Sequence, residues 1–126
     1  MLKIEGKEIE ITRGNMLPID VTAKNEVTGG DYEFQPGDVI RFTIFDKKNV
    51  ETVYLQKDFN VEEAATMVQI VMTAGEMKIG ELSNKSAIYW WELELNPDTD
   101  KTQTIVGYTK DEGPAIITIV PEGGDQ

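Results

Sequence analysis

The sequence predicts an all-β fold, an antiparallel β-sandwich of about seven or eight short strands. Valine, isoleucine and threonine together number 35 of the 126 residues, against 12 alanines and leucines, and this bias is typical of pleated sheet. Several segments alternate apolar and polar residues, which places the two kinds on opposite faces of a strand. Clusters of glycine, proline, asparagine and aspartate separate these segments at regular intervals, as turns do between strands.

Four strands are predicted in the first half of the chain. They cover residues 8–12, 17–24, 39–45 and 53–57. Pro18 has no amide hydrogen to donate, so the second strand is expected to begin at a sheet edge or to run along one. Pro36 and Gly37 fit a type II turn within residues 34–38, because proline presets φ and glycine supplies the positive φ. The turn at residues 46–49 predicts a hairpin between the third and fourth strands.

Residues 61–72 fit two patterns. A helical stripe would consist of Val61, Ala64, Ala65, Val68 and Met72, with Asn60 as its cap. The alternation over residues 66–72 fits a strand instead, and β-branched residues are concentrated in this half. We favour the strand, and residues 73–76 then fit one short, capped turn of helix.

The clearest strand covers residues 87–95. Its inward face would carry Tyr89, Trp91, Leu93 and Leu95, and its outward face Ile88, Trp90, Glu92 and Glu94. Residues 102–109 and 115–120 are expected to close the sheet as a pair of strands around a turn at residues 110–114. The chain is predicted to form a single domain, residues 1–126, in which residues 121–126 are a flexible tail.

The composition excludes several classes of function. The chain contains no cysteine and no histidine, so disulfides, Cys–His zinc sites and catalysis that depends on either residue are excluded. Its 12 basic and 23 acidic residues give a formal net charge of −11, which opposes binding to nucleic acids and to anionic membranes. No apolar run is long enough to span a bilayer, and the first residues do not resemble a signal peptide. We expect neither a metal nor a cofactor.

Three groups of polar residues have the composition of a site but a simpler structural explanation. Glu92 and Glu94 lie two residues apart on one strand face, as paired carboxylates of glycosidases can. Their alternation with apolar neighbours predicts a solvent-exposed face without a cleft. Asp98 and Asp100 resemble the start of a calcium loop but lack its further ligands, and Asn-Pro-Asp is ordinary turn chemistry. The two serines have no histidine base, so we expect no catalytic residues.

Trp90 and Trp91 form the most informative local feature. Because adjacent strand residues face opposite ways, Trp91 is expected in the core and Trp90 on the outer face beside Ile88. Trp90 could lie flat over side chains of its own sheet, anchor a protein interface, or serve as a sugar-stacking platform. The further rings that a platform needs could come only from Tyr54, Tyr89 and Tyr108. The interface is the preferred hypothesis, with Trp90, Ile88 and Tyr108 as its residues.

Six stretches of the chain follow a known succession of strands and turns. They are residues 9–15 (I-E-I-T-R-G-N), 35–43 (Q-P-G-D-V-I-R-F-T), 78–82 (K-I-G-E-L), 89–99 (Y-W-W-E-L-E-L-N-P-D-T), 103–108 (Q-T-I-V-G-Y) and 121–123 (P-E-G). Together they resemble small structural proteins from tailed phages and prophages of Gram-positive bacteria. The likeness covers most of the chain, and each motif consists mainly of ordinary strand and turn residues. Asn15 stands where the family more often has aspartate, and residues 61–72 depart from the pattern.

This resemblance implies an immunoglobulin-like or related β-sandwich, similar to the N-terminal domains of baseplate and receptor-binding subunits. It supplies no catalytic motif. The leading hypothesis is therefore a non-enzymatic virion structural protein, of the tail or baseplate or else of the head, assembled in the cytoplasm of the bacterial host. Its partners would be other virion subunits and copies of itself, contacted through strand edges and an apolar patch around Trp90. The alternative is a carbohydrate-binding module for host cell-wall glycans, and an enzyme is the least supported hypothesis.

Overall fold

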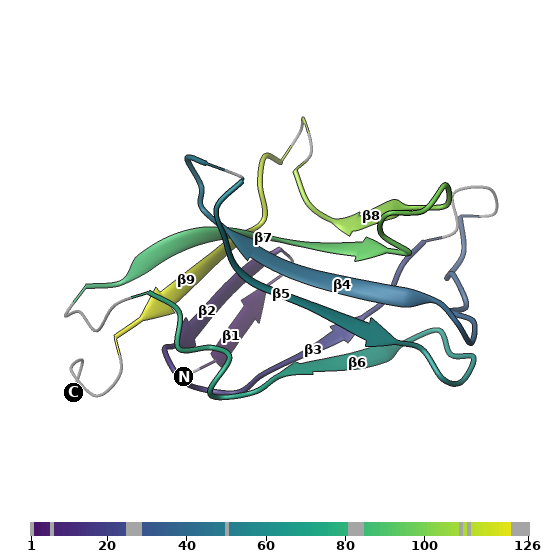
Figure 1. Ribbon diagram of the computed structural model, residues 1–126, viewed down its shortest axis with the longest axis horizontal. Coiled ribbons are helices and arrows are strands. Elements are labelled where there is room, and N and C mark those ends of the chain that lie inside the picture. The colour runs from purple at the N-terminus through teal and green to yellow at the C-terminus, as the bar shows by residue number, and fades with distance from the viewer. Residues whose placement is uncertain are drawn as a thin grey trace.

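The computed structural model shows an all-β protein (Figure 1). It describes residues 2–5, 7–24, 29–49, 51–80, 85–108, 110 and 112–121. Within these ranges there are nine strands and no helix. The strands are β1 (Leu2–Glu5), β2 (Glu8–Thr12), β3 (Leu17–Val21), β4 (Val39–Phe45), β5 (Val53–Asn60), β6 (Val68–Met72), β7 (Ala87–Leu95), β8 (Gln103–Val106) and β9 (Ile116–Val120).

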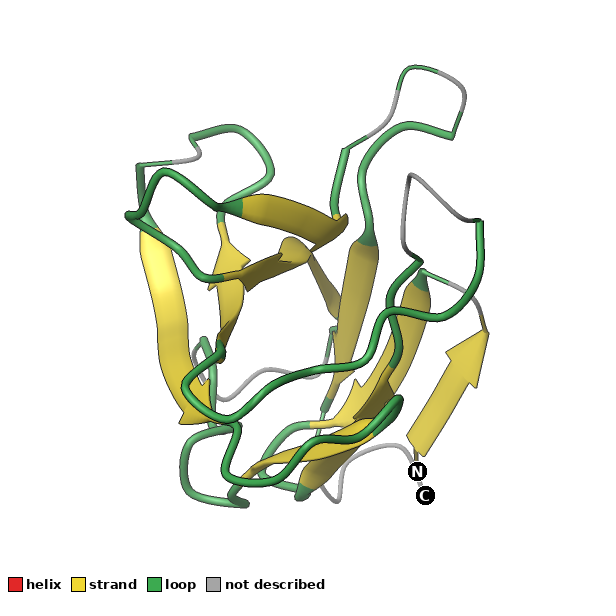
Figure 2. Cartoon of the chain, turned by 90° about the vertical axis from the view of Figure 1, so that its right-hand side faces the viewer, coloured by secondary structure: helices red, strands yellow, loops and turns green. Residues whose placement is uncertain are grey.

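The strands form two sheets, an arrangement consistent with a β-sandwich. The larger sheet has the order β1-β2-β9-β7-β4-β5, with β8 also paired to β7, and the smaller sheet is the pair β3-β6. Figure 2 shows that only strands and loops build the described part of the fold. The sequence predicts antiparallel pairing throughout, but the larger sheet is mixed, because β2 and β9 pair in parallel. The immunoglobulin-like type stays a prediction.

Alternating side chains of both sheets meet in one hydrophobic core. The inward residues of the central strands are Ile40, Phe42 and Ile44 on β4 and Trp91, Leu93 and Leu95 on β7, each at most 4% exposed. The smaller sheet contributes Leu17, Ile19, Val21, Ile70 and Met72. Each fully buried side chain of this kind stabilises the fold by roughly 1.5–3 kcal/mol. The expected core position of Trp91 is confirmed.

Several predicted elements have the expected form. The strands β4 and β7 have the predicted bounds, and β4 and β5 form the expected hairpin. The turn before β4 has Gly37 at φ 96°, and the amide of Asp38 donates to the carbonyl of Gln35 over 3.0 Å. Pro18 lies in β3, whose only strand partner among the described residues is β6, so its place at an edge is confirmed.

The ambiguous segment is a strand, as favoured, but it begins at Val68 rather than at residue 66. The turn that follows contains a reciprocal cap. The amide of Thr73 donates to the carboxylate of Glu76 over 2.8 Å, and the amide of Glu76 donates to the Thr73 hydroxyl over 3.2 Å. The amide of Met77 also donates to the Thr73 carbonyl, so this is one capped helical turn that does not extend into a helix.

The prediction for the last two strands was wrong in one respect. Strands β8 and β9 do not pair with each other. Both lie along β7, where β9 pairs with its first half and β8 with its second half. The nine residues of β7 are long enough to accept both partners in succession. Strand β1 was not predicted either.

Residues 122–126, which make up most of the expected tail, lie outside the described residues, and Ser83 does too. In the described part of the chain, no helix has the length and apolar character needed to cross a membrane.

Candidate functional site

The outward face of the larger sheet is built from successive rows of side chains. Strand register aligns Gln56 on β5, Thr43 on β4 and Glu92 on β7 in one row. The next row aligns Phe45 with Trp90. These residues alternate with the core residues of the same strands. The register that aligns the core residues therefore also aligns the residues of the outward face.

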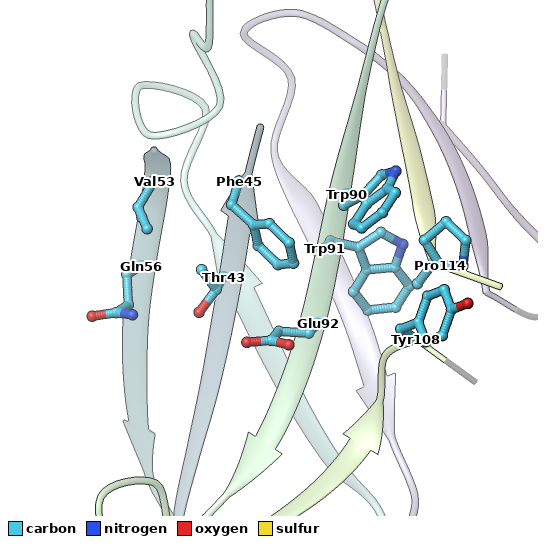
Figure 3. A pocket seen from close by; sticks show the side chains of 10 residues that line it. Thr43, Phe45, Val53, Gln56, Trp90, Trp91, Glu92, Tyr108 and Pro114 are labelled. Carbon is cyan, nitrogen blue, oxygen red and sulfur yellow. The ribbon is translucent and has the colours of Figure 1, made fainter. Parts of the chain in front are cut away.

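These rows line a pocket of about 450 Å³, here called the outer groove (Figure 3). Its lining residues are Thr43, Phe45, Val53, Gln56, Trp90, Trp91, Glu92, Tyr108, Pro114 and Ala115. Three come from the segment between β8 and β9, which borders the groove on one side. The groove therefore combines a sheet floor with a loop wall.

Aromatic rings form the apolar part of the outer groove. The ring of Trp90 contacts Phe45 edge-on, with centroids 6.2 Å apart, and Tyr108 at 6.5 Å with an interplanar angle of 31°. Tyr108 is 67% exposed, whereas Trp90 is partly buried. The rings thus present a connected apolar surface to solvent.

Two polar groups of the outer groove are unusual. Thr43 is 4% exposed, and its hydroxyl has no hydrogen-bond partner among the residues that the structure describes. Glu92 is partly buried, and its pKa is raised, first by burial and second by the negative charge of Glu94. The expectation of a solvent-exposed carboxylate face without a cleft was therefore wrong for Glu92, because the segment after β8 comes close to it.

The segment after β8 is held by Lys7. The Lys7 ammonium donates 2.8 Å hydrogen bonds to the carbonyls of both Gly107 and Gly113. Gly107 itself is buried, and a Cβ at this position would lie 2.8 Å from Cγ2 of Thr104 and 3.9 Å from a carboxylate oxygen of Glu92. A glycine here lets the chain pass close to β7, which places Tyr108 beside Trp90.

The structure brings two of the three predicted interface residues into contact. Trp90 and Tyr108 share the outer groove, while Ile88 lies two residues along the same face of β7, is 45% exposed and does not line the groove. Tyr54 and Tyr89 contact each other, with centroids 4.9 Å apart, and line no part of the groove. The interface role of these residues stays a prediction.

Sequence reasoning missed the polar row of the groove. The alternation along β4 puts Thr43 on the face opposite Phe42 and Ile44, but nothing in the local sequence shows that Glu92 and Gln56 flank it. The register of β4 with its two neighbours supplies that information. Phe45 was missed for the same reason.

The aspartates of the turn after β7 have structural partners. Among the described residues there is no group of three or more carboxylates that could hold an ion. Asp98 instead forms a 3.0 Å ion pair with Arg41, whose guanidinium also forms two hydrogen bonds with Asp58. Positive φ values at Asn96 and Asp98 identify the segment as a tight turn.

No protein-family model, no curated protein and no solved structure matches this chain. Its function is therefore inferred from the outer groove, from the exposed surface around it and from the resemblance of its strand and turn motifs.

Proposed function

We propose that this chain is a non-enzymatic structural subunit of a tailed-phage virion, placed in the tail or baseplate or alternatively in the head, with an immunoglobulin-like fold. It would assemble through the outer groove and the adjoining Ile88, which bind another virion subunit or another copy of the chain. The observation that carries the proposal is the connected, exposed apolar surface on one sheet face. The resemblance to phage structural proteins supports it.

The exposures of individual residues favour a protein partner. Val53, Ile88 and Tyr108 are 48%, 45% and 67% exposed, and they lie in or beside the outer groove. Exposed apolar surface of this kind is typical of binding sites, and tryptophan and tyrosine are the residues that most often dominate binding energy at protein interfaces. The groove adds a concave centre in which a side chain of the partner can be shielded from water.

A specific observation also favours the carbohydrate-binding alternative. The rings of Trp90 and Tyr108 are inclined by only 31°, so they offer nearly parallel faces on which a sugar ring could stack. Glu92, Thr43 and Gln56 line the same groove and carry the polar groups that a sugar's hydroxyl groups could bond. Host cell-wall glycans are therefore the second candidate ligand.

The proposal is tested in particles produced with variant chains after prophage induction. Wild-type chain should be found by peptide mass spectrometry at stoichiometric abundance in purified particles. Trp90→Glu should fold, as shown by circular dichroism, yet be lost from the particles, because a charge would enter the apolar surface. Met67→Glu is the matched control, since Met67 is 54% exposed and lies outside the groove.

Particles that lack the wild-type chain would contradict the virion role. Normal incorporation of Trp90→Glu would contradict the choice of surface. Tryptophan fluorescence titrated with cell-wall glycans tests the second candidate, and no change across a broad glycan panel would remove it.

A further inference from the structure

We propose that the outer groove binds the side-chain ammonium of a lysine presented by the protein partner. Glu92, Thr43 and Gln56 would accept its hydrogen bonds, and the aromatic rings would contact its aliphatic stem. This inference rests on the proposed function, because it names the chemistry that the partner brings to the same surface.

The arrangement of acceptors matches the donors of an ammonium group. Gln56, Thr43 and Glu92 stand side by side on three neighbouring strands, which lie about 4.8 Å apart in a sheet. Each can offer an oxygen, and a lysine ammonium has three donors and no acceptor. The row thus offers an amide oxygen, a hydroxyl and a carboxylate in succession along the groove.

The hydroxyl of Thr43 also favours a hydrogen-bonding ligand in the groove. A hydroxyl buried to this degree is normally hydrogen-bonded, because an unpaired one loses its bonds to water without compensation. Thr43 lines the groove, but its hydroxyl oxygen is covered by the atoms around it, so a donor reaches it only when neighbouring side chains move aside. An ammonium that did so would satisfy the hydroxyl and pair with the carboxylate at the same time.

The charges around the groove favour a cation over a neutral ligand. Glu92 has no ion pair among the described residues, and Glu94 adds a second negative charge on the same strand face. Arg41, which stands in register with Glu94, is already bound to Asp58 and Asp98. The whole chain carries a formal charge of −11. A sugar could supply hydrogen bonds but would leave the carboxylate charge unopposed.

The aromatic wall suits the rest of a lysine side chain. Lysine commonly lays its four-carbon stem along apolar surface while its charged end stays in a polar environment. The faces of Trp90, Phe45 and Tyr108 offer such a surface, and ring faces also attract cations. The groove therefore has a place for both ends of the side chain.

The test uses the full chain and a matched pair of probes. Nα-acetyl-lysine amide is titrated into the protein, and chemical shifts of the backbone amides at Thr43 and Glu92 and of the Trp90 indole are followed by NMR. We expect saturable shifts with a dissociation constant on the order of millimolar, which is typical of a single small contact. The same compound acetylated on its side-chain nitrogen has no positive charge and should cause no saturable shift.

Two variants distinguish the effect of the Glu92 carboxylate on binding from that of the nearby negative charge of Glu94. Glu92→Gln should weaken binding by about tenfold or more, because it removes the charged acceptor. Glu94→Gln is the control, since Glu94 lies on the same strand outside the groove, and it should weaken binding less than about threefold. Equal binding of the acetylated probe, or unchanged binding by Glu92→Gln, would overturn the inference.

The outcomes also distinguish this inference from the proposed function. If the lysine probe fails to bind while Trp90→Glu still abolishes incorporation into particles, the outer groove remains the proposed interface, and the proposed lysine ligand is wrong. If N-acetylglucosamine oligomers shift the same resonances and the lysine probe does not, the groove is a sugar site and the inference falls. If the lysine probe binds but the chain is absent from particles, the site stands and the virion role is contradicted.

Discussion

The indole nitrogen of Trp91 donates a 2.9 Å hydrogen bond to the backbone carbonyl of Lys7. The ammonium of the same lysine bonds to the carbonyls of Gly107 and Gly113. One residue thus joins the tryptophan of the core to the segment that carries Tyr108 on the outer surface. The aromatic wall of the outer groove is consequently positioned from the inside of the fold.

Replacing the Lys7 side chain should loosen that wall. Lys7→Met keeps the aliphatic stem but removes the two hydrogen bonds, leaving both carbonyls without this partner. We expect a loss of about 1–3 kcal/mol in the free energy of unfolding, measured in urea. Amide hydrogen exchange at Gly107 and Tyr108 should become faster. Lys47→Met, at an exposed turn, is the control, and equal effects of the two substitutions would contradict the role of Lys7.

A methyl group at Gly107 should be too large for its site. The added Cβ of Gly107→Ala would approach Cγ2 of Thr104 to 2.8 Å, which forces a shift because threonine has a short, branched side chain. Overpacking of this kind costs about 1–3 kcal/mol. Thr104→Ser removes the opposing methyl group, so the double variant should recover most of the loss in urea denaturation. A fully stable Gly107→Ala would show that the segment can move away from β7 at no cost.

The sequence predicts a strand well where one of its faces packs in the core and the other face points away from it. Apolar residues of the core alternate with residues of the opposite face along β4 and along the second half of β7, and the bounds of both strands were predicted correctly. Alternation says which residues share a face, but it does not say which strand lies alongside. The parallel pairing of β2 with β9 joins segments from opposite ends of the chain, and no local pattern specifies it.

The same distinction applies to the candidate site. Trp90 could be placed on the outer face because its neighbour Trp91 had to face the core. Glu92 was expected in water, since its own strand shows only an alternation with leucines. Its partial burial depends on the segment held by Lys7, which is distant in sequence and has no signature around Glu92.

The ion pair of Arg41 with Asp58 should make the free energy of unfolding depend on pH in the acidic range. The guanidinium lowers the pKa of Asp58 below its ordinary value of 3.8. The stabilisation is therefore present above that pH and is lost as the pH falls through the lower pKa of the folded state. Because Asp58 is 45% exposed, Asp58→Asn should cost only about 0.5–1 kcal/mol at neutral pH. Urea unfolding across acidic pH should show the two proteins converge.

The control for this pair is Asp31→Asn. Asp31 also forms an ion pair, with Lys24, but both side chains are more than half exposed, so water and salt screen it more strongly. We expect almost no change in unfolding free energy at any pH. A difference between wild type and Asp58→Asn that persists at low pH would show that Asp58 stabilises the fold through something other than its charge.

The carboxylate of Glu92 should reduce the stability of the fold. Its pKa is raised above the ordinary value of 4.5, so the folded state binds a proton more tightly than the unfolded state, and stability falls as the pH rises through this window. At neutral pH the charge is unfavourable, and Glu92→Gln should raise the free energy of unfolding by up to about 1 kcal/mol, since water still reaches the partly exposed group. The gain should disappear well below pH 4.5, where the Glu92 carboxyl of the wild type is protonated in both states.

A stabilising effect of Glu92→Gln would also support the role of Glu92 in binding. A carboxylate that costs stability in the isolated chain is expected at a site where a ligand later compensates the charge. Glu94→Gln, on the same strand face but outside the groove, removes only the smaller cause of the raised pKa of Glu92, the repulsion between the two carboxylates, so it should raise the unfolding free energy by less than Glu92→Gln does. If both variants stabilise the chain equally, repulsion among its acidic residues explains the effect. If Glu92→Gln stabilises it more, the additional penalty comes from burial in the groove.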